Sequence, residues 1–514
     1  MLNTLYKNAK IITMDPSMPT ASWVATCDGK IAAIGNDSDP LPKAAKVIDM
    51  KGKSIVPGLI DTHMHGTSTG FALNSVRLGD TTSIAEVVEL MKEGAKKDGD
   101  NWVFGSAFSV QAMAENRAPT RWELDEISGD HPMMIQYVTL HGAVVNTKAM
   151  EMLDIPLDLD GVIQNEDGEL TGEYRSDESC FLAMGRALGF LDDSELEKFI
   201  KTATKYAASK GVTTMHSLDG QFVENDRDFF MWMNLSDSLP VRVINYFQST
   251  NIELAKALGL PRIGGCLTLD GAGFEATMAN TEPFPFKPDS NGILYWTDEE
   301  VYEFTSAVNK AGLQCGMHAL GDRAIEQLLT AYERVIKEQG NKDLRHRIEH
   351  FSLCTPDQIE RAAKLGLSLT MQPVFPYLWD DPNTKLGDSY NWMLGRERAT
   401  QMEPFPEIIA AGGVVAGGSD SPVTMTDPVL GIHAAANQPN EVRRVSLDDA
   451  IKMFTLNAAW ITHDEDKKGS IEIGKLADFT VLDRNMYEEP TKIKDFKVEM
   501  TIVDDKAVYV RKED

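Results

Sequence analysis

Short apolar runs that end in histidine or aspartate constrain the fold of this chain more than any other feature. His63 and His65 close the first such run, His318 and His350 close two later ones, and Asp420 ends another. In a strand, residues i and i+2 point to the same side, so His63 and His65 can share one cation. Polar groups gathered at the C-terminal ends of several parallel strands are typical of a (β/α)8 barrel.

The order of the remaining apolar runs supports the same fold. Strand-like runs alternate with amphipathic helix-like segments, as a right-handed series of βαβ units requires. The eight runs that we assign to barrel strands end at or near His65, His216, Phe247, Asp270, His318, His350, Gln372 and Asp420. The sequence therefore predicts an α/β fold built on a (β/α)8 TIM-type barrel.

Both ends of the chain are predicted to form short strands, and neither has enough apolar residues for a core of its own. We expect residues 1–55 and 470–514 to meet in one small β-sandwich-like domain, with the barrel in residues 56–469. The interval of about 67–195 is too long for one helix. We interpret it as an insertion after barrel strand 1 that walls a substrate pocket, the alternative being a remote structural appendage.

Composition excludes some classes of partner. The formal net charge of -28 makes nucleic acid a poor partner, because phosphate binding needs clustered Lys and Arg. An acidic surface could favour cationic substrates, although solubility is the simpler explanation. The five cysteines form no close-spaced framework, which favours a reducing compartment. Without signal-peptide features or a membrane-spanning apolar stretch, we expect a cytoplasmic protein with no membrane partner.

Six motifs lie in order along nearly the whole chain, at residues 57–65, 318–324, 347–350, 371–373, 418–423 and 469–478. The first is Pro-Gly-Leu-Ile-Asp-Thr-His-Met-His and the fifth is Gly-Ser-Asp-Ser-Pro-Val. Together they resemble the amidohydrolase superfamily, and more narrowly its branch of large amidohydrolases that includes N-substituted formamide deformylases.

This resemblance implies a metal site at the C-terminal mouth of the barrel. His63 and His65 would bind one divalent cation, and His318 and His350 the same cation or a second one. Asp420 would ligate metal and also transfer the proton. Zinc is the metal that we expect first, as one or two ions. The resemblance and the chain length also suggest a homo-oligomer.

One position departs from the family pattern. Many relatives carry a carboxylated lysine on the fourth barrel strand, four residues before an Asp-Gly pair; here Cys266 stands four residues before Asp270. Side-chain alternation points Cys266 and Asp270 into the barrel and turns Leu267 and Leu269 toward the helices. We consider Cys266, in this order, as a bridging thiolate, a bystander at a mononuclear site, or a small core residue in a chain that has lost part of its metal site.

Four further residues are weaker candidates. His141, in the insertion, and Arg323, beyond His318, are predicted to bind substrate. The simpler alternatives are a loop histidine and a structural ion pair. Glu173 and Glu178 could supply a compensating carboxylate, although solvated surface charge explains them more simply.

The combined prediction is hydrolysis of a non-peptide C–N bond, of amide type, in a small organic substrate. Metal-activated water would attack, with Asp420 as general base and then general acid. Two alternatives are a hydrolytic deaminase on the same barrel and a catalytically silent barrel that acts as a binding protein. A deaminase usually has a glutamate close behind the histidine of the fifth strand, whereas Ala-Leu-Gly-Asp follows His318.

Overall fold

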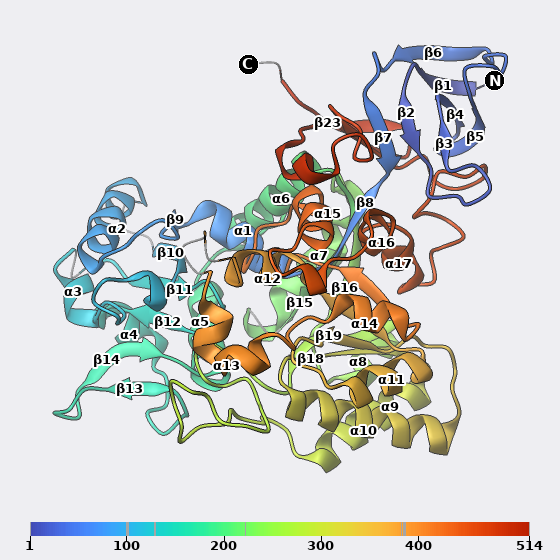
Figure 1. The fold of residues 1–514 in the computed structure, drawn as a ribbon. Coiled ribbons are helices and arrows are strands. Elements are labelled where there is room, and N and C mark those ends of the chain that lie inside the picture. The colour runs from blue at the N-terminus through green and yellow to red at the C-terminus, as the bar shows by residue number, and fades with distance from the viewer. Residues whose placement is uncertain are drawn as a thin grey trace.

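Eight parallel strands form the sheet at the centre of the protein (Figure 1). The computed structural model describes residues 2–98, 102–127, 130–220, 223–381, 383 and 387–512. In chain order, the eight strands are β8 (Leu59–Met64), β15 (Val212–Asp219), β16 (Arg242–Phe247), β17 (Arg262–Thr268), β18 (Gln314–Ala319), β19 (Arg347–His350), β20 (Ser368–Met371) and β21 (Val414–Gly417). Each neighbours the next in the sheet, so the predicted barrel is confirmed.

The ring closes between the first and last strands, just beyond the end of β21. Met64 forms a parallel bridge with Ser421, and the backbone N–H of Asp420 donates to the carbonyl of His63 at 2.8 Å. A β-carbon at Gly418 would lie 2.5 Å from the β-carbon of His63, so only glycine permits this approach. The closure therefore brings the first histidine pair beside Asp420.

Amphipathic helices surround the barrel. Thr297 and Glu300 form a capping box that starts α9. Leu267 and Leu269 of the fourth strand and its continuation pack in the same core cluster as helix residues Val301 and Leu328, which confirms the predicted alternation on that strand. The helices around the barrel are α6 (Asp193–Ser209), α7 (Arg227–Leu235), α8 (Ile252–Ala257), α9 (Asp298–Ala311), α10 (Asp322–Gln339), α11 (Pro356–Leu365), α14 (Phe405–Ala410), α15 (Pro428–Ala436), α16 (Leu447–Met453) and α17 (Leu456–Trp460).

Between β8 and β15 the chain builds a second sheet that lies beside the barrel, at the left of Figure 1. This sheet has its own apolar clusters on both faces. Its strands, in the order β13-β14-β12-β11-β10-β9, are β9 (Val76–Arg77), β10 (Val103–Phe108), β11 (Met133–Tyr137), β12 (Ala143–Val145), β13 (Val162–Gln164) and β14 (Leu170–Tyr174). The accompanying helices are α1 (Gly66–Asn74), α2 (Ile84–Asp98), α3 (Arg121–Asp125), α4 (Thr147–Leu153) and α5 (Asp177–Gly189).

Strands from both termini share a six-stranded sheet, in the order β24-β23-β22-β7-β2-β3. A four-stranded sheet, β5-β4-β1-β6, packs against it through residues such as Val24, Ile55 and Phe479. The predicted sandwich-like arrangement of the two ends is thus confirmed. The strands are β1 (Leu2–Lys7), β2 (Lys10–Ile12), β3 (Thr20–Ala21), β4 (Trp23–Cys27), β5 (Lys30–Gly35), β6 (Ala44–Asp49), β7 (Ser54–Pro57), β22 (Phe479–Leu482), β23 (Val498–Val503) and β24 (Lys506–Val510).

Two helices, α12 (Val374–Trp379) and α13 (Ser389–Ala399), follow the seventh barrel strand. Within the described part of the chain, every helix is too short or too polar to cross a lipid bilayer.

Candidate metal centre and substrate pocket

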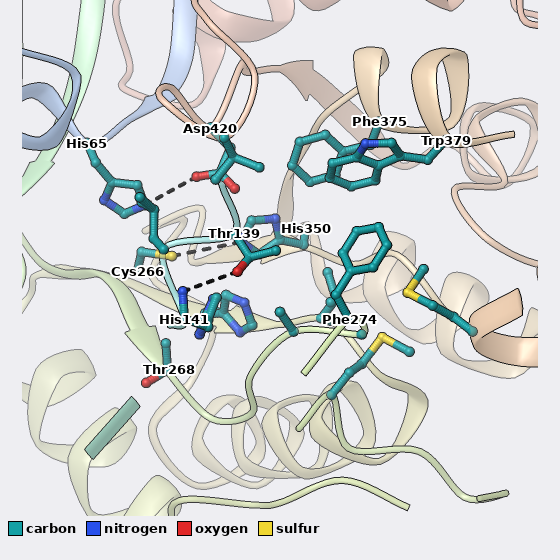
Figure 2. A pocket seen from close by; sticks show the side chains of 18 of the residues that line it. His65, Thr139, His141, Cys266, Thr268, Phe274, His350, Phe375, Trp379 and Asp420 are labelled. Atoms are coloured by element: carbon teal, nitrogen blue, oxygen red, sulfur yellow. Dashed lines mark hydrogen bonds and ion pairs between the residues drawn. The ribbon is translucent and has the colours of Figure 1, made fainter. Parts of the chain in front are cut away.

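Five of the predicted ligands meet at the C-terminal ends of the barrel strands. Figure 2 shows His65, Cys266, His350 and Asp420 of this set. They form two overlapping buried groups, His63, His65 and Cys266 in one and His63, His350 and Asp420 in the other. Within each group the donor atoms all lie within 4.8 Å of one another. Imidazole, thiolate and carboxylate are the ligand types of protein zinc sites.

The donor atoms of this centre lie close together, yet some of them form no hydrogen bond. Nε2 of His63 and Nε2 of His65 each lie 3.2 Å from Oδ1 of Asp420, and Sγ of Cys266 lies 3.9 Å from Nε2 of His350. Among the described residues, His63 Nε2 and Asp420 Oδ1 have no hydrogen-bond partner. Buried polar atoms normally have partners, so this donor set fits a bound cation.

In the two donor groups, the other ring nitrogen of each histidine is held by a neighbouring acceptor. This arrangement turns each Nε2 into the site and fixes the tautomer that ligates metal. The pairs are His63 Nδ1 with Glu349 Oε2 at 2.7 Å, His65 Nδ1 with the Leu218 carbonyl at 3.2 Å, and His350 Nδ1 with Gln372 Oε1 at 2.8 Å. His318 Nδ1 lies 3.0 Å from Asp270 Oδ1 but outside hydrogen-bond geometry.

Glu349 is in turn held by a buried arginine. Arg347 Nε lies 2.6 Å from Glu349 Oε1 and its Nη2 2.8 Å from Oε2. Burial would raise the pKa of Glu349, but the Arg347 guanidinium lowers it to about 2. The acceptor that orients His63 is therefore ionised. Sequence analysis missed this role, although Arg347 and Glu349 sit at i and i+2 on the strand that ends at His350.

Charge in the centre follows from the close contact of acids and imidazoles. Burial alone would lower the pKa of His63 and of His65, but contacts with Asp420 and Cys266 raise both, that of His65 to about 10. Burial would raise the pKa of the Cys266 thiol and of the Asp420 carboxyl, yet the imidazoles, His63 first, hold both well below their usual values. Two anionic donors in a buried site attract a cation.

Two of the donors occupy left-handed backbone. His350 has a φ of 73° and Asp420 a φ of 56°, in a region that residues other than glycine rarely adopt. Such a conformation costs roughly 1–3 kcal/mol per residue and persists only where the surrounding structure enforces it. Strain at two donors of one cluster is typical of a functional site.

Of the other predicted site residues, two line the pocket and one lies outside it. His318 and His141 line the same pocket, with the His318 ring centroid 4.5 Å from that of His350 and 5.8 Å from that of His141. Arg323 lies outside this lining, and its Nη1 donates to the carbonyls of Asn280 and Asn291 at 3.5 and 3.4 Å.

The two acidic candidates of the insertion do not reach the centre. Glu173 is buried, where it accepts hydrogen bonds from Tyr137 and from Arg175 Nε at 2.5 Å. Its interpretation as solvated surface charge was wrong. Glu178 is exposed on α5, as surface charge should be.

An apolar pocket adjoins the metal-binding side chains. In Figure 2, Phe274, Phe375 and Trp379 lie across it from His65 and Cys266. The pocket and its open mouth contain about 780 Å³ of empty space, open solvent included. Thr139, Leu140, His141 and Phe181 of the insertion also line it, so the insertion walls the pocket and is no remote appendage.

Comparison with protein families decides the family of this chain. Residues 46–509 match the model described as "Amidohydrolase family". The chain belongs to the amidohydrolase family. The match spans the barrel, β7 and the C-terminal strands, and it begins beyond β1 to β5. It includes all six motifs.

Individual relatives agree with this assignment. The chain is 28% identical to Protein LONG AFTER FAR-RED 3 of Arabidopsis thaliana, over 98% of this chain and 91% of that protein. It is 25% identical to an N-substituted formamide deformylase of Arthrobacter pascens, over 99% of both chains. The crystal structure of an uncharacterized metal-dependent hydrolase from Pyrococcus furiosus, 25% identical, superposes with a TM-score of 0.73 over 94% of this chain and 99% of that one.

Proposed function

We propose that this amidohydrolase-family protein is a metal-dependent hydrolase that cleaves a C–N bond of amide type, other than a peptide bond, in a small organic molecule. The observation that carries the proposal is the convergence of five donor side chains in one buried centre beside an apolar pocket. The Arthrobacter relative, named as a deformylase of N-substituted formamides, supports an amide as the first substrate class to test. The net charge of -28 argues against nucleic acid as the partner.

His63, His65, His350 and Asp420 would hold a divalent ion, zinc in the first instance, with Cys266 and His318 as the further predicted ligands. When bound, this ion supplies Lewis-acid chemistry: it polarises a carbonyl and lowers the pKa of water. Asp420 accepts a proton from the attacking water and returns it to the amine nitrogen as the C–N bond breaks. The aromatic side of the pocket positions the remainder of the substrate.

The first test is metal content. We expect the purified full chain to carry close to one or two equivalents of a first-row divalent metal by elemental analysis, and added zinc to raise its unfolding temperature. Less than about a tenth of an equivalent, with no thermal protection by added metal, would favour the silent barrel instead.

The second test is Asp420→Asn. We expect this substitution to keep the fold and to lower kcat for a formamide or related amide by about 10²–10⁴-fold, because the proton carrier is lost. Circular dichroism checks the fold, and release of the amine measures turnover. Asp237→Asn, which removes the same charge from the exposed surface, is the matched control. Full activity in Asp420→Asn would remove this residue from the mechanism.

A further inference from the structure

The apolar side of the pocket contains a carboxylate that the proposed hydrolysis does not use. Glu403 lines the pocket, yet only 1% of its surface is exposed. Among the described residues its Oε2 has no hydrogen-bond partner. A buried carboxylate oxygen without a partner is costly, so its retention beside a ligand pocket calls for a functional explanation.

The backbone and one hydroxyl fix Glu403 in place. Its backbone N–H donates to the carbonyl of Ser352 at 2.8 Å, and Tyr390 Oη donates to its Oε1 at 3.0 Å. Ser352 lies two residues beyond His350, so this contact ties Glu403 to the segment that leaves the metal centre. Glu403 also has a φ of 46°, a left-handed conformation that costs stability. Tyr390 thus holds one carboxylate oxygen, and the Ser352 hydroxyl also lies close enough to lower the pKa of Glu403. By hydrogen-bond geometry Oε2 has no partner among the described residues and can accept from a ligand.

The positive side chains of the described pocket lining are imidazoles of the metal centre, such as His65, and not partners of this carboxylate. Among the described residues that line the pocket, none is lysine or arginine. Arg443 is close enough to influence Glu403 by its charge. However, its guanidinium is committed to the carbonyls of Met402 and Ala399 and to the carboxylate of Asp380.

Aromatic rings surround the space near Glu403. Phe375 and Trp379 have ring centroids 4.3 Å apart, and Trp379 contacts Phe274 and Tyr390 at 5.6 and 6.2 Å. Aromatic faces attract cations, most strongly in a desolvated pocket. The whole chain has a net charge of -28, which also attracts cations to the protein.

We propose that Glu403 is a specificity-determining residue that binds a positively charged, N–H-bearing group of the substrate, such as an amidinium, guanidinium or ammonium. This inference rests on the proposed function for the statement that the bound molecule is a substrate to be hydrolysed. The binding of a cationic group by Glu403 does not depend on that function. A charged N–H donor would fill the open side of Oε2, and the aromatic rings would flank it. Burial raises the pKa of Glu403 to about 7, and a bound cation would lower it again.

The test compares three ligands of nearly the same shape: benzamidine, which is cationic, benzamide, which is neutral, and benzoate, which is anionic. Binding to the metal-loaded full chain is measured by isothermal titration at pH 8. We expect benzamidine to bind about tenfold or more tightly than benzamide, because only it places charged N–H donors before Glu403. Protonated benzamidine offers a metal no free lone pair, so direct coordination cannot produce this order.

Glu403→Gln keeps the size and an acceptor oxygen for Tyr390 but removes the charge. We expect it to abolish the preference for benzamidine while leaving benzamide binding within about twofold of the wild type. Glu397→Gln, which removes an exposed glutamate six residues earlier, should keep the full preference. A variant that retains the preference without Glu403 would overturn the assignment.

Wild-type binding alone also decides the question if Glu403→Gln does not fold. Benzamide or benzoate binding as tightly as benzamidine would overturn the proposal. The relative affinities of the three ligands are measured without turnover, so the result is independent of the hydrolase proposal. Amide hydrolysis without a preference for benzamidine would reject the role of Glu403 alone, whereas the preference without any hydrolysis would reject the hydrolase alone.

Discussion

At the scale of single residues, His63 connects the two donor groups. Its Nδ1 is committed to Glu349, which leaves only Nε2 for a metal, and one imidazole nitrogen binds one ion. The groups that contain Cys266 and Asp420 therefore overlap in one centre. If this centre holds two ions, a side chain of the centre that bridges them must be a thiolate or a carboxylate. Cys266 and Asp420 are the residues of those types in the two groups.

Metal stoichiometry tests the thiolate. We expect Cys266→Ala to lose at least half of the bound metal, or about tenfold in affinity for it, because a donor of the first group is removed. Elemental analysis and competition with a chelator measure both quantities. Cys315→Ala is the matched control, since Cys315 is buried in the apolar core on the next strand. Unchanged stoichiometry and affinity in Cys266→Ala would make this cysteine a bystander.

The stability of the protein should depend on the ionisation of Glu403. Burial raises its pKa from 4.5 to about 7, with Arg443, Tyr390 and Ser352 opposing the rise and Asp380 adding to it. Burial, and then the charge of Glu403, raise the pKa of Cys354. A raised carboxyl pKa favours folding at low pH, and this contribution is lost as pH rises from about 4.5 through 7.

We therefore expect Glu403→Gln to be more stable than the wild type at pH 8, by an amount on the order of 3 kcal/mol, and to show little difference at pH 5. Urea unfolding at the two pH values measures the change. Such a gain on removal of a buried charge is expected of a residue kept for binding. A difference that does not vary with pH would show that Glu403 does not change its charge in this range.

The sequence could predict His63, His350 and Asp420 because each closes a short apolar run, where the ends of parallel strands meet. Glu403 gave no such signal. It lies between two helices of a long connection, and its approach to the pocket depends on a contact with Ser352 that only the folded chain creates. Glu349 could have been found from its alternation with Arg347.

At the scale of elements, the fourth barrel strand shows how glycine directs a side chain. The register of β17 against β18 shifts between Ile263 and Leu267, and Gly264 and Gly265 within the shift have φ values of 96° and 67°. A bulge of this kind redirects the following side chain, here Cys266, toward the pocket. Alternation predicted the direction of Cys266, but the Gly-Gly pair was not recognised as a bulge signal.

Gly264→Ala should disrupt this bulge. A β-carbon there would lie 2.2 Å from the carbonyl oxygen of Gly316 on the neighbouring strand, in addition to the unfavourable φ. We expect a loss of roughly 3 kcal/mol or more in unfolding free energy, and reduced metal content because Cys266 is displaced. Gly312→Ala is the control: Gly312 has a φ of 73° but open space around it, so its cost should be about 1 kcal/mol. Equal costs at both positions would contradict the role of the close contact.

At the scale of the whole molecule, the sheet built from both termini is joined to the barrel by more than the chain itself. Arg242 of β16 pairs with the buried carboxylate of Asp478 at 2.8 Å. The hydroxyls of Thr480 and Thr501 each donate at 2.6 Å to carbonyls near the junction of α6 and β15. The sequence predicted that both ends contribute strands, since neither can form a core alone. These cross-links could not be predicted, because they join residues more than 200 positions apart.

The C-terminal strands should be required for folding of the remainder. A chain that ends at Asp478 lacks β22, β23 and β24, which leaves β7 without its antiparallel partner and uncovers core residues such as Val24 and Ile55. Because exposed apolar surface and an open strand edge promote aggregation, we expect this chain to be insoluble or to unfold without a cooperative transition, as scanning calorimetry and size-exclusion chromatography would measure. A chain that ends at Val510 is the control. Among the described residues it loses the ion pair of Arg511 with Glu499 and one backbone hydrogen bond between them, each worth about 1 kcal/mol. Soluble, cooperative, metal-containing protein from the shorter chain would mean that the barrel folds without this sheet.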